Sequence, residues 1–116
     1  MTNYDKSISF KLNILGDKIR QTRESKGLLL RQAAAFLEVD TALVSKLERG
    51  ERRAQKDQVV KLAKFLRVDA NELLVLWIAD RLMDLVGGEK LAEEALDLVI
   101  KEIRNNSNLK LQNSNK

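Results

Sequence analysis

The sequence contains no cysteine, no histidine and no proline, and these absences exclude several classes of protein. Without cysteine the chain cannot form a disulfide or offer a thiolate to a metal ion. Without histidine it lacks the most common general base and the most common metal ligand, so most hydrolase mechanisms are hard to build. We therefore do not expect an enzyme, and the sequence predicts no cofactor and no metal site.

Long apolar segments are missing as well. The longest apolar run, Leu73–Ala79, has seven residues, whereas a membrane-spanning helix needs about 20. Residues 1–13 lack the apolar core of a signal peptide. Apolar residues nevertheless make up 44% of the 116 residues, which is enough for a modest core. We expect a cytoplasmic protein with no membrane partner.

Charge is distributed unevenly along the chain. Residues 1–68 hold 15 Lys and Arg against 8 Asp and Glu, a net charge of +7, whereas residues 69–116 hold 6 against 9, a net charge of −3. A basic half is typical of a module that binds phosphate groups. A chance imbalance of solvated charges would look the same, so the interpretation depends on the motifs.

Apolar residues recur at spacings of three and four along almost the whole chain, which predicts an all-α fold. Gly27 and Gly50 are placed to end helices, and Asp40 is placed to cap the start of one. Residues 106–116 are rich in Asn and Ser, and we expect them to be disordered. The predicted helices span residues 13–25, 30–37, 41–49, 56–66, 70–86 and 89–104.

The most informative segment is residues 28–50, which the pattern divides into two short helices joined by a tight turn. Val39 in that turn is predicted to be an apolar plug between the helices. The second helix ends at Glu48-Arg49-Gly50. This spacing is typical of a helix-turn-helix, whose second helix lies in the major groove of DNA.

Residues 15–74 resemble the Xre-type helix-turn-helix family, to which the lambdoid phage repressors and Cro belong. The residues that carry the resemblance include Leu15-Gly16, Ala33-Ala34, Val44-Ser45, Leu47–Gly50 and Leu62–Lys64. The resemblance implies a five-helix, lambda-repressor-like domain, here with an additional C-terminal helix. It divides the chain into an N-terminal arm (1–12), a DNA-binding domain (13–74), a C-terminal helical extension (75–105) and a disordered tail (106–116).

The family places its base contacts on the helix predicted at 41–49. Lys46 can donate to guanine, and the methyl groups of Thr41 and Ala42 can meet a thymine methyl. A solvated helix face is the alternative for Lys46, and a small filler is an equally good interpretation of Ala42. The candidate base-reading residues are Thr41, Ala42, Ser45, Lys46 and Arg49.

Basic residues around this helix are candidates for contacts with the DNA backbone. In this family the loop after the recognition helix runs along the phosphates. A helix N-terminus also favours phosphate, because its N–H groups and dipole attract anions. Such contacts position the protein but carry no sequence information. The candidate phosphate-binding residues are Arg31, Arg52, Arg53 and Lys56.

The sequence departs from the family pattern at the start of the helix predicted at 30–37. Leu29 and Leu30 stand where a capping Ser or Thr and a phosphate-binding Gln are usual, so we expect both contacts to be lost. The two leucines are hypothesised to pack against Phe10 or Leu12. Glu51 is a second departure, because an acidic side chain so close to the DNA backbone must point away or weaken binding.

Glu48 is interpreted as structural. The family uses this residue to hold neighbouring helices together, commonly through a buried ion pair with an arginine of the first helix. Arg20 is the predicted partner. Loss of Glu48 would then unfold the domain more than it would alter DNA specificity.

The segment Leu73–Ala79 is apolar on every side of a helix, so one face can seal the core while the other needs a second cover. We expect the last helix to cover part of this second face and a second subunit to cover the rest, because single helix-turn-helix units usually bind DNA as two-fold dimers. The alternative is a monomer in which the last helix covers all of it. Asp80 and Asp84 lie one turn apart and are interpreted as a solvated acidic face rather than an ion site. The candidate dimer contacts are Leu74, Trp77, Ile78 and Arg81.

These observations predict a sequence-specific regulator of transcription that binds double-stranded DNA as a homodimer. A short domain with a small helical extension also resembles the controller proteins of restriction–modification systems. The first alternative is an antitoxin that binds a toxin and autoregulates its operon, for which a co-purifying toxin would be diagnostic. A protein–protein adaptor is a further alternative, which loss of the basic recognition surface would favour.

Overall fold

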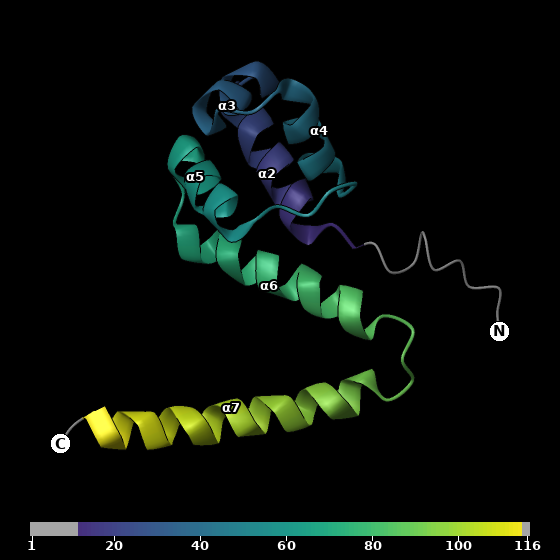
Figure 1. The fold of residues 1–116 in the computed structure, drawn as a ribbon, viewed down its shortest axis with the longest axis vertical. Coiled ribbons are helices and arrows are strands. Elements are labelled where there is room, and N and C mark those ends of the chain that lie inside the picture. The colour runs from purple at the N-terminus through teal and green to yellow at the C-terminus, as the bar shows by residue number, and fades with distance from the viewer. Residues whose placement is uncertain (1–11, 115–116) are drawn as a thin grey trace. The chain divides into compact units, whose positions relative to one another are not determined.

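The computed structural model describes the backbone of residues 12–114 and the side chains of residues 12–107 (Figure 1). Within this range the chain forms six α-helices and no strands, so the predicted all-α fold is confirmed. The described residues divide into two compact units, with the boundary after residue 85. The helices are α2 (Ile14–Ser25), α3 (Leu30–Leu37), α4 (Thr41–Arg49), α5 (Lys56–Leu66), α6 (Ala70–Val86) and α7 (Ala92–Ser114).

Four helices of the first unit, α3 to α6, have the bounds that the sequence predicts, and α2 begins one residue later than predicted. The first unit extends to residue 85 and so includes nearly all of α6, whereas the resemblance placed a boundary at residue 74. The helical extension expected over residues 75–105 is therefore divided between the two units.

The second unit contains α7, which differs from its predicted bounds at both ends. The turn after Gly87-Gly88 continues through residues 89–91, and the helix starts at Ala92 rather than Glu89. At the other end it runs on to Ser114, through residues expected to be disordered. Asn and Ser are less favourable in a helix than Ala by only about 0.5 kcal/mol per residue. Without a Gly or Pro to break the helix, composition was a poor guide to its end.

Two helices of the first unit end in the same way. Glu38 after α3 and Arg67 after α5 have left-handed backbone conformations, with φ angles of 61° and 60°. In each case the next residue, Val39 or Val68, donates its backbone N–H to the carbonyl five residues earlier, at 3.0 Å. This is the Schellman arrangement, and both valines pack against the core. The prediction of Val39 as an apolar plug is confirmed.

The core of the first unit is built from the inward faces of α2 to α6. Alanines on α3 and α5 allow these helices to pack closely. Each fully buried Leu, Ile or Val side chain stabilises the fold by roughly 1.5–3 kcal/mol relative to an exposed one. The largest fully buried apolar side chains are Ile19, Val44, Val59, Leu62, Leu66 and Leu73.

Asp80 on α6 caps the N-terminus of α2 from a distant part of the chain. Its carboxylate accepts hydrogen bonds from the backbone N–H groups of Ile14 and Leu15, both at 3.0 Å. Only 2% of the residue is exposed, so the expectation of a solvated acidic face is wrong for Asp80. These two bonds satisfy N–H groups that have no partner within α2, and they fix α2 to α6.

Candidate nucleic-acid interface

Helix α4 is stabilised at both ends by its own sequence. The Asp40 carboxylate accepts a hydrogen bond from the backbone N–H of Leu43 at 2.8 Å, as predicted for an N-cap. Gly50 ends the helix with φ +74°, a conformation that most side chains disfavour. The start and the end of α4 are therefore set by residues at its own two ends.

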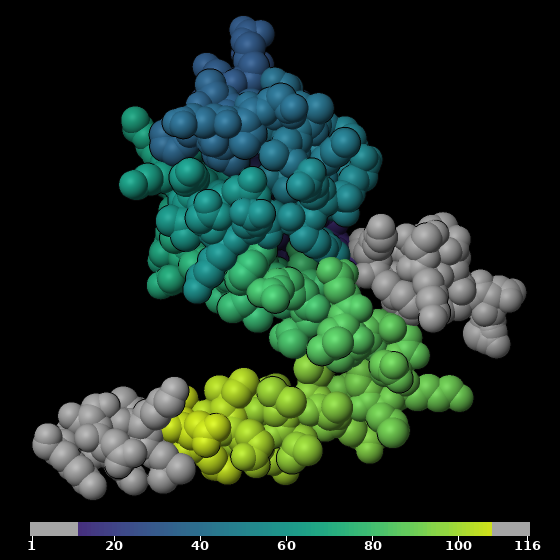
Figure 2. All heavy atoms as spheres, viewed as in Figure 1, coloured from purple at the N-terminus to yellow at the C-terminus, as the bar shows by residue number. Residues whose placement is uncertain are grey.

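The two faces of α4 differ in character. Val44 and Leu47 are buried in the core, whereas Thr41, Ala42 and Lys46 are exposed. Ser45 is half-buried between these faces. Figure 2 shows α3 and α4 side by side on one face of the first unit, where their outer side chains are open to solvent. The candidate base-reading residues thus share an accessible surface.

A buried ion pair holds α4 against α2. The Arg23 guanidinium donates to both carboxylate oxygens of Glu48, from Nε at 2.7 Å and from Nη2 at 3.0 Å. Its Nη1 donates to the Leu28 carbonyl at 2.8 Å. The hydrogen bond with Glu48 raises the pKa of Arg23 above its ordinary value, although burial opposes the shift. The structural interpretation of Glu48 therefore agrees with its position.

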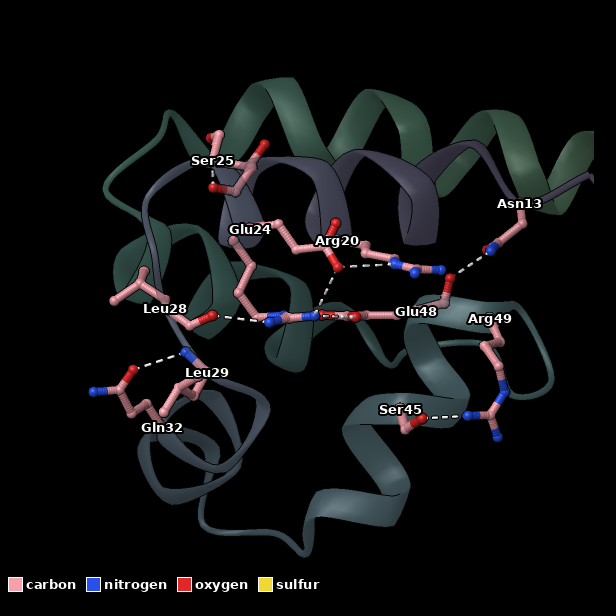
Figure 3. Close-up of polar contacts among 12 residues, drawn as sticks. Asn13, Arg20, Glu24, Ser25, Leu28, Leu29, Gln32, Ser45, Glu48 and Arg49 are labelled. Atoms are coloured by element: carbon pink, nitrogen blue, oxygen red, sulfur yellow. Dashed lines mark hydrogen bonds and ion pairs between the residues drawn. The ribbon is translucent and has the colours of Figure 1, made fainter.

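The predicted partner of Glu48, Arg20, was the wrong arginine. Arg20 is exposed and pairs with Glu24 on its own helix, with 3.3 Å between its Nε and the carboxylate. Arg23 lies three residues further along α2, on the side that faces the core. Figure 3 marks the ion pair between Arg20 and Glu24. The rotation of α2 about its axis decides which arginine reaches Glu48.

A close approach of α2 to the end of α4 supports the same arrangement. The Asn13 side chain donates from Nδ2 to the Glu48 carbonyl oxygen at 2.6 Å (Figure 3). A Cβ atom at Gly16 would lie only 2.5 Å from that carbonyl oxygen. Glycine is therefore required where the two helices cross, which gives a physical reason for Gly16.

Arg49, at the end of α4, is held by two side chains. Its Nε and Nη2 donate to the two carboxylate oxygens of Glu51 at 2.6 and 3.1 Å. Its Nη1 donates to the hydroxyl of Ser45 (Figure 3). The hydrogen bond with Glu51 raises the pKa of Arg49. Glu51 therefore does not simply point away, because it orients one of the candidate base-reading residues.

The loop between α4 and α5 contains two arginines in different environments. Arg52 is exposed. Arg53, a predicted phosphate contact, donates to Asp84 from Nε at 2.8 Å and from Nη2 at 2.7 Å. Asp80 lies 3.5 Å from its Nη1, and the hydrogen bond with Asp84 raises the pKa of Arg53. Arg53 therefore has a structural role in the folded unit, which sequence spacing did not indicate.

Helix α6 fixes this loop at a second point. The Trp77 indole N–H donates to the backbone carbonyl of Ala54 at 2.7 Å. Trp77, Asp80 and Asp84 are spaced three and four residues apart, so they share one face of α6. We call these three residues the α6 clamp, because together they contact the 50–55 loop and the start of α2.

The start of α3 is capped in an unexpected way. Leu29 makes no side-chain cap, as predicted, but the Gln32 side chain accepts a hydrogen bond from the Leu29 backbone N–H at 2.8 Å (Figure 3). This is one half of a capping box. Leu29 is exposed and Leu30 packs against the core. Of the two hypothesised packing partners of these leucines, Phe10 lies outside the described residues and Leu12 is exposed.

The other candidate phosphate contacts, Arg31 on α3 and Lys56 at the start of α5, are exposed. Among the described residues there is no group of acidic side chains suited to a metal ion. Within the same range, no helix combines the length and apolar character needed to cross a membrane.

The candidate dimer residues on α6 divide into two kinds. Leu74 and Trp77 pack partly against the core of their own unit, and the Arg81 guanidinium carbon lies 4.6 Å from the centre of the Trp77 ring. Ile78 is 51% exposed. It lies in a stripe of exposed apolar side chains with Val75 63%, Leu82 40% and Leu85 75% exposed. These three residues were not among the predicted dimer contacts.

Comparison with known proteins gives a consistent result. Residues 14–76 match the family described as "Helix-turn-helix domain". A crystal structure of the clp gene regulator ClgR from Corynebacterium glutamicum is 26% identical, with a TM-score of 0.52 over 77% of this chain and 88% of its own. A second ClgR structure is 25% identical, with a TM-score of 0.51 over 58% of this chain and 87% of its own. No curated protein matches the sequence.

Proposed function

This chain belongs to the helix-turn-helix domain family, and we propose that it is a sequence-specific regulator of transcription that binds double-stranded DNA as a homodimer. The observation that carries the proposal is the arrangement of α4. Its inner face is fixed by core packing and by the buried Arg23–Glu48 pair, while its outer face is accessible and polar. Such a helix can enter the major groove without rearranging.

The outer face of α4 supplies suitable chemistry for reading bases. Lys46 can donate to the O6 and N7 atoms of guanine, and the methyl groups of Thr41 and Ala42 can contact thymine. Ser45 lies in the middle of the same helix and Arg49 is its last residue. We therefore keep all five residues as the proposed reading surface.

Exposed basic residues around α4 are suited to the DNA backbone. We propose phosphate contacts for Arg31, Arg52 and Lys56, which are all exposed. Lys56 is the first residue of α5, where the helix dipole adds to its attraction for phosphate. Arg53 is left out of this set, because Asp80 and Asp84 already neutralise its guanidinium.

The exposed stripe on α6 supports a dimer. Val75, Ile78, Leu82 and Leu85 follow the three–four–three spacing with which paired helices bury a seam. Two such chains related by a two-fold axis would present two α4 helices to half-sites about 34 Å apart. Ile78 and Arg81 stay in the proposed interface, with Val75, Leu82 and Leu85 added.

The test is selection of duplexes from a randomised library, followed by affinity measurements on the selected sequence. We expect a two-fold symmetric consensus for the wild type, which Lys46→Ala loses or alters at defined positions. Lys64→Ala is the matched control, because it removes an exposed lysine from α5 rather than α4. No enrichment by the wild type, or an identical consensus with Lys46→Ala, would contradict the proposal.

The oligomeric state is measured separately by analytical ultracentrifugation. We expect a dimer for the wild type and a monomer for Ile78→Asp, because a charge in the middle of the stripe would have to be desolvated on association. A wild-type monomer at micromolar concentration would refute the dimer without refuting DNA binding.

A further inference from the structure

The contact between Glu51 and Arg49 brings an acidic residue into the proposed reading surface. Both side chains are about half exposed, at 53% and 49%. An exposed ion pair of this kind contributes little to the stability of a fold. Its geometry is nevertheless specific, because two parallel N–H···O bonds join the guanidinium to the carboxylate. Stability is therefore a poor explanation for a pair that fixes the direction of an arginine.

A third bond completes the orientation of Arg49. Its Nη1 donates to the hydroxyl of Ser45, one turn earlier on α4. The guanidinium is thus held between Ser45 on α4 and Glu51 in the turn that follows. An arginine has five N–H donors, and the three bonds leave one N–H on each terminal nitrogen for a further acceptor.

Those two remaining donors suit a guanine. Guanine presents O6 and N7 side by side in the major groove, and an arginine that donates to both makes the most common specific contact with DNA. A free arginine side chain loses rotamer freedom when it makes that contact, whereas one that is already oriented loses less. Prior orientation therefore strengthens discrimination between bases.

We propose that Glu51 is a positioning residue that directs Arg49 towards a guanine at the edge of each half-site, with Ser45 as the second support. The proposal rests on the proposed function, since it assumes that α4 reads DNA. Glu51 would then favour specific binding, whereas the sequence alone indicated only that its negative charge opposes contact with the DNA backbone.

The carboxylate has two opposite effects on DNA binding. It orients Arg49, which favours the correct base pair, and it repels nearby phosphates, which disfavours every sequence equally. Removal of Glu51 should therefore lower specificity without lowering affinity for random DNA. A residue that only stabilised the fold would lower both together.

The experiment compares wild type, Glu51→Ala, Glu51→Gln and Arg49→Ala on the selected duplex, on its single-position variants and on random DNA. Arg49→Ala is expected to lose about 5- to 150-fold of discrimination at one position in each half-site, the range for a bidentate contact. Glu51→Ala should lose part of the discrimination at that same position, with equal or tighter binding to random DNA. Glu51→Gln keeps the shape and should lie between Glu51→Ala and wild type.

Glu72→Ala is the matched control, because it removes an exposed carboxylate from α6 and should leave every base preference unchanged. Thermal unfolding of each variant verifies that the domain is folded. If the wild type selects a consensus but Glu51→Ala retains all its base preferences, this proposal is overturned while the proposed function stands. If Arg49→Ala alters no base preference, this proposal is likewise overturned while the proposed function stands. If the wild type selects no consensus, the proposed function and this proposal both fall.

Discussion

Substitution of Asp80 by Asn tests whether α6 is part of the folded DNA-binding unit. The change removes the negative charge and replaces one carboxylate oxygen by an NH₂ group. This NH₂ group would face a backbone N–H and cannot accept a hydrogen bond from it. Asp80 is 2% exposed, so water cannot replace the lost acceptor. The start of α2 would lose one of its two bonds to α6.

The expected cost follows from these contacts. A hydrogen bond to a charged group contributes about 1.5–3 kcal/mol, and a buried donor left without a partner costs about 1–3 kcal/mol. We therefore expect Asp80→Asn to lower the free energy of unfolding by about 3 kcal/mol. For a unit of this size each kcal/mol corresponds to about 4–8 °C in Tm, so Tm should fall by about 12 °C or more.

Asp84→Asn is the matched control, one turn further along the same helix. Its side chain is 40% exposed and pairs with Arg53 at the surface. Such a pair contributes below about 1 kcal/mol. Urea denaturation followed by circular dichroism measures both variants, with the dependence on urea concentration checked for equality. Equal losses for the two aspartates would refute the assignment of Asp80 as the cap of α2.

Three further predictions follow from the same structure. Arg23→Ala should lower the free energy of unfolding by about 3–5 kcal/mol, because it leaves a buried carboxylate unpaired, whereas Arg20→Ala should lower it by less than about 1 kcal/mol. Urea denaturation measures both variants, and a larger loss for Arg20→Ala would contradict the ion-pair assignment. Arg52→Ala should reduce the slope of log DNA affinity against log salt concentration by about 0.9, the value for one phosphate contact, while Arg53→Ala should leave that slope unchanged. A reduced slope for Arg53→Ala would show that DNA displaces the carboxylates of Asp80 and Asp84 from Arg53. Gly16→Ala should cost about 1–3 kcal/mol through overpacking against α4, and unchanged thermal unfolding would mean that the crossing is looser than the 2.5 Å approach implies.

The helices of the first unit were predictable because their signals are local. Asp40 and Gly50 mark the ends of α4 through bonds within a few residues, and apolar spacing marks the inward face of each helix. The end of α7 was not predictable in this way. Residues 106–114 contain no helix breaker, so their polar composition suggested disorder where the structure has a helix.

Contacts between distant residues were harder to predict than helices. Arg20 and Arg23 are both spaced to face Glu48, and sequence spacing alone does not give the rotation of α2 that selects Arg23. The role of Asp80 had no sequence signal, because its partners are backbone N–H groups 65 and 66 residues away. The resemblance indicated that Glu48 pairs with an arginine, and only the packed structure identified which one.

Helix α6 is apolar on every side of residues 73–79, yet its faces differ in their contacts. One face carries the clamp of Trp77, Asp80 and Asp84, which holds the loop after α4 and the start of α2 within a single chain. The stripe around Ile78 lies outside these contacts. Because the clamp needs no second subunit, each chain would hold α4 in its reading position before it dimerises. The proposed dimer would then bind two half-sites at once, which raises the overall affinity for DNA. The base preference at each half-site would remain that of the single chain.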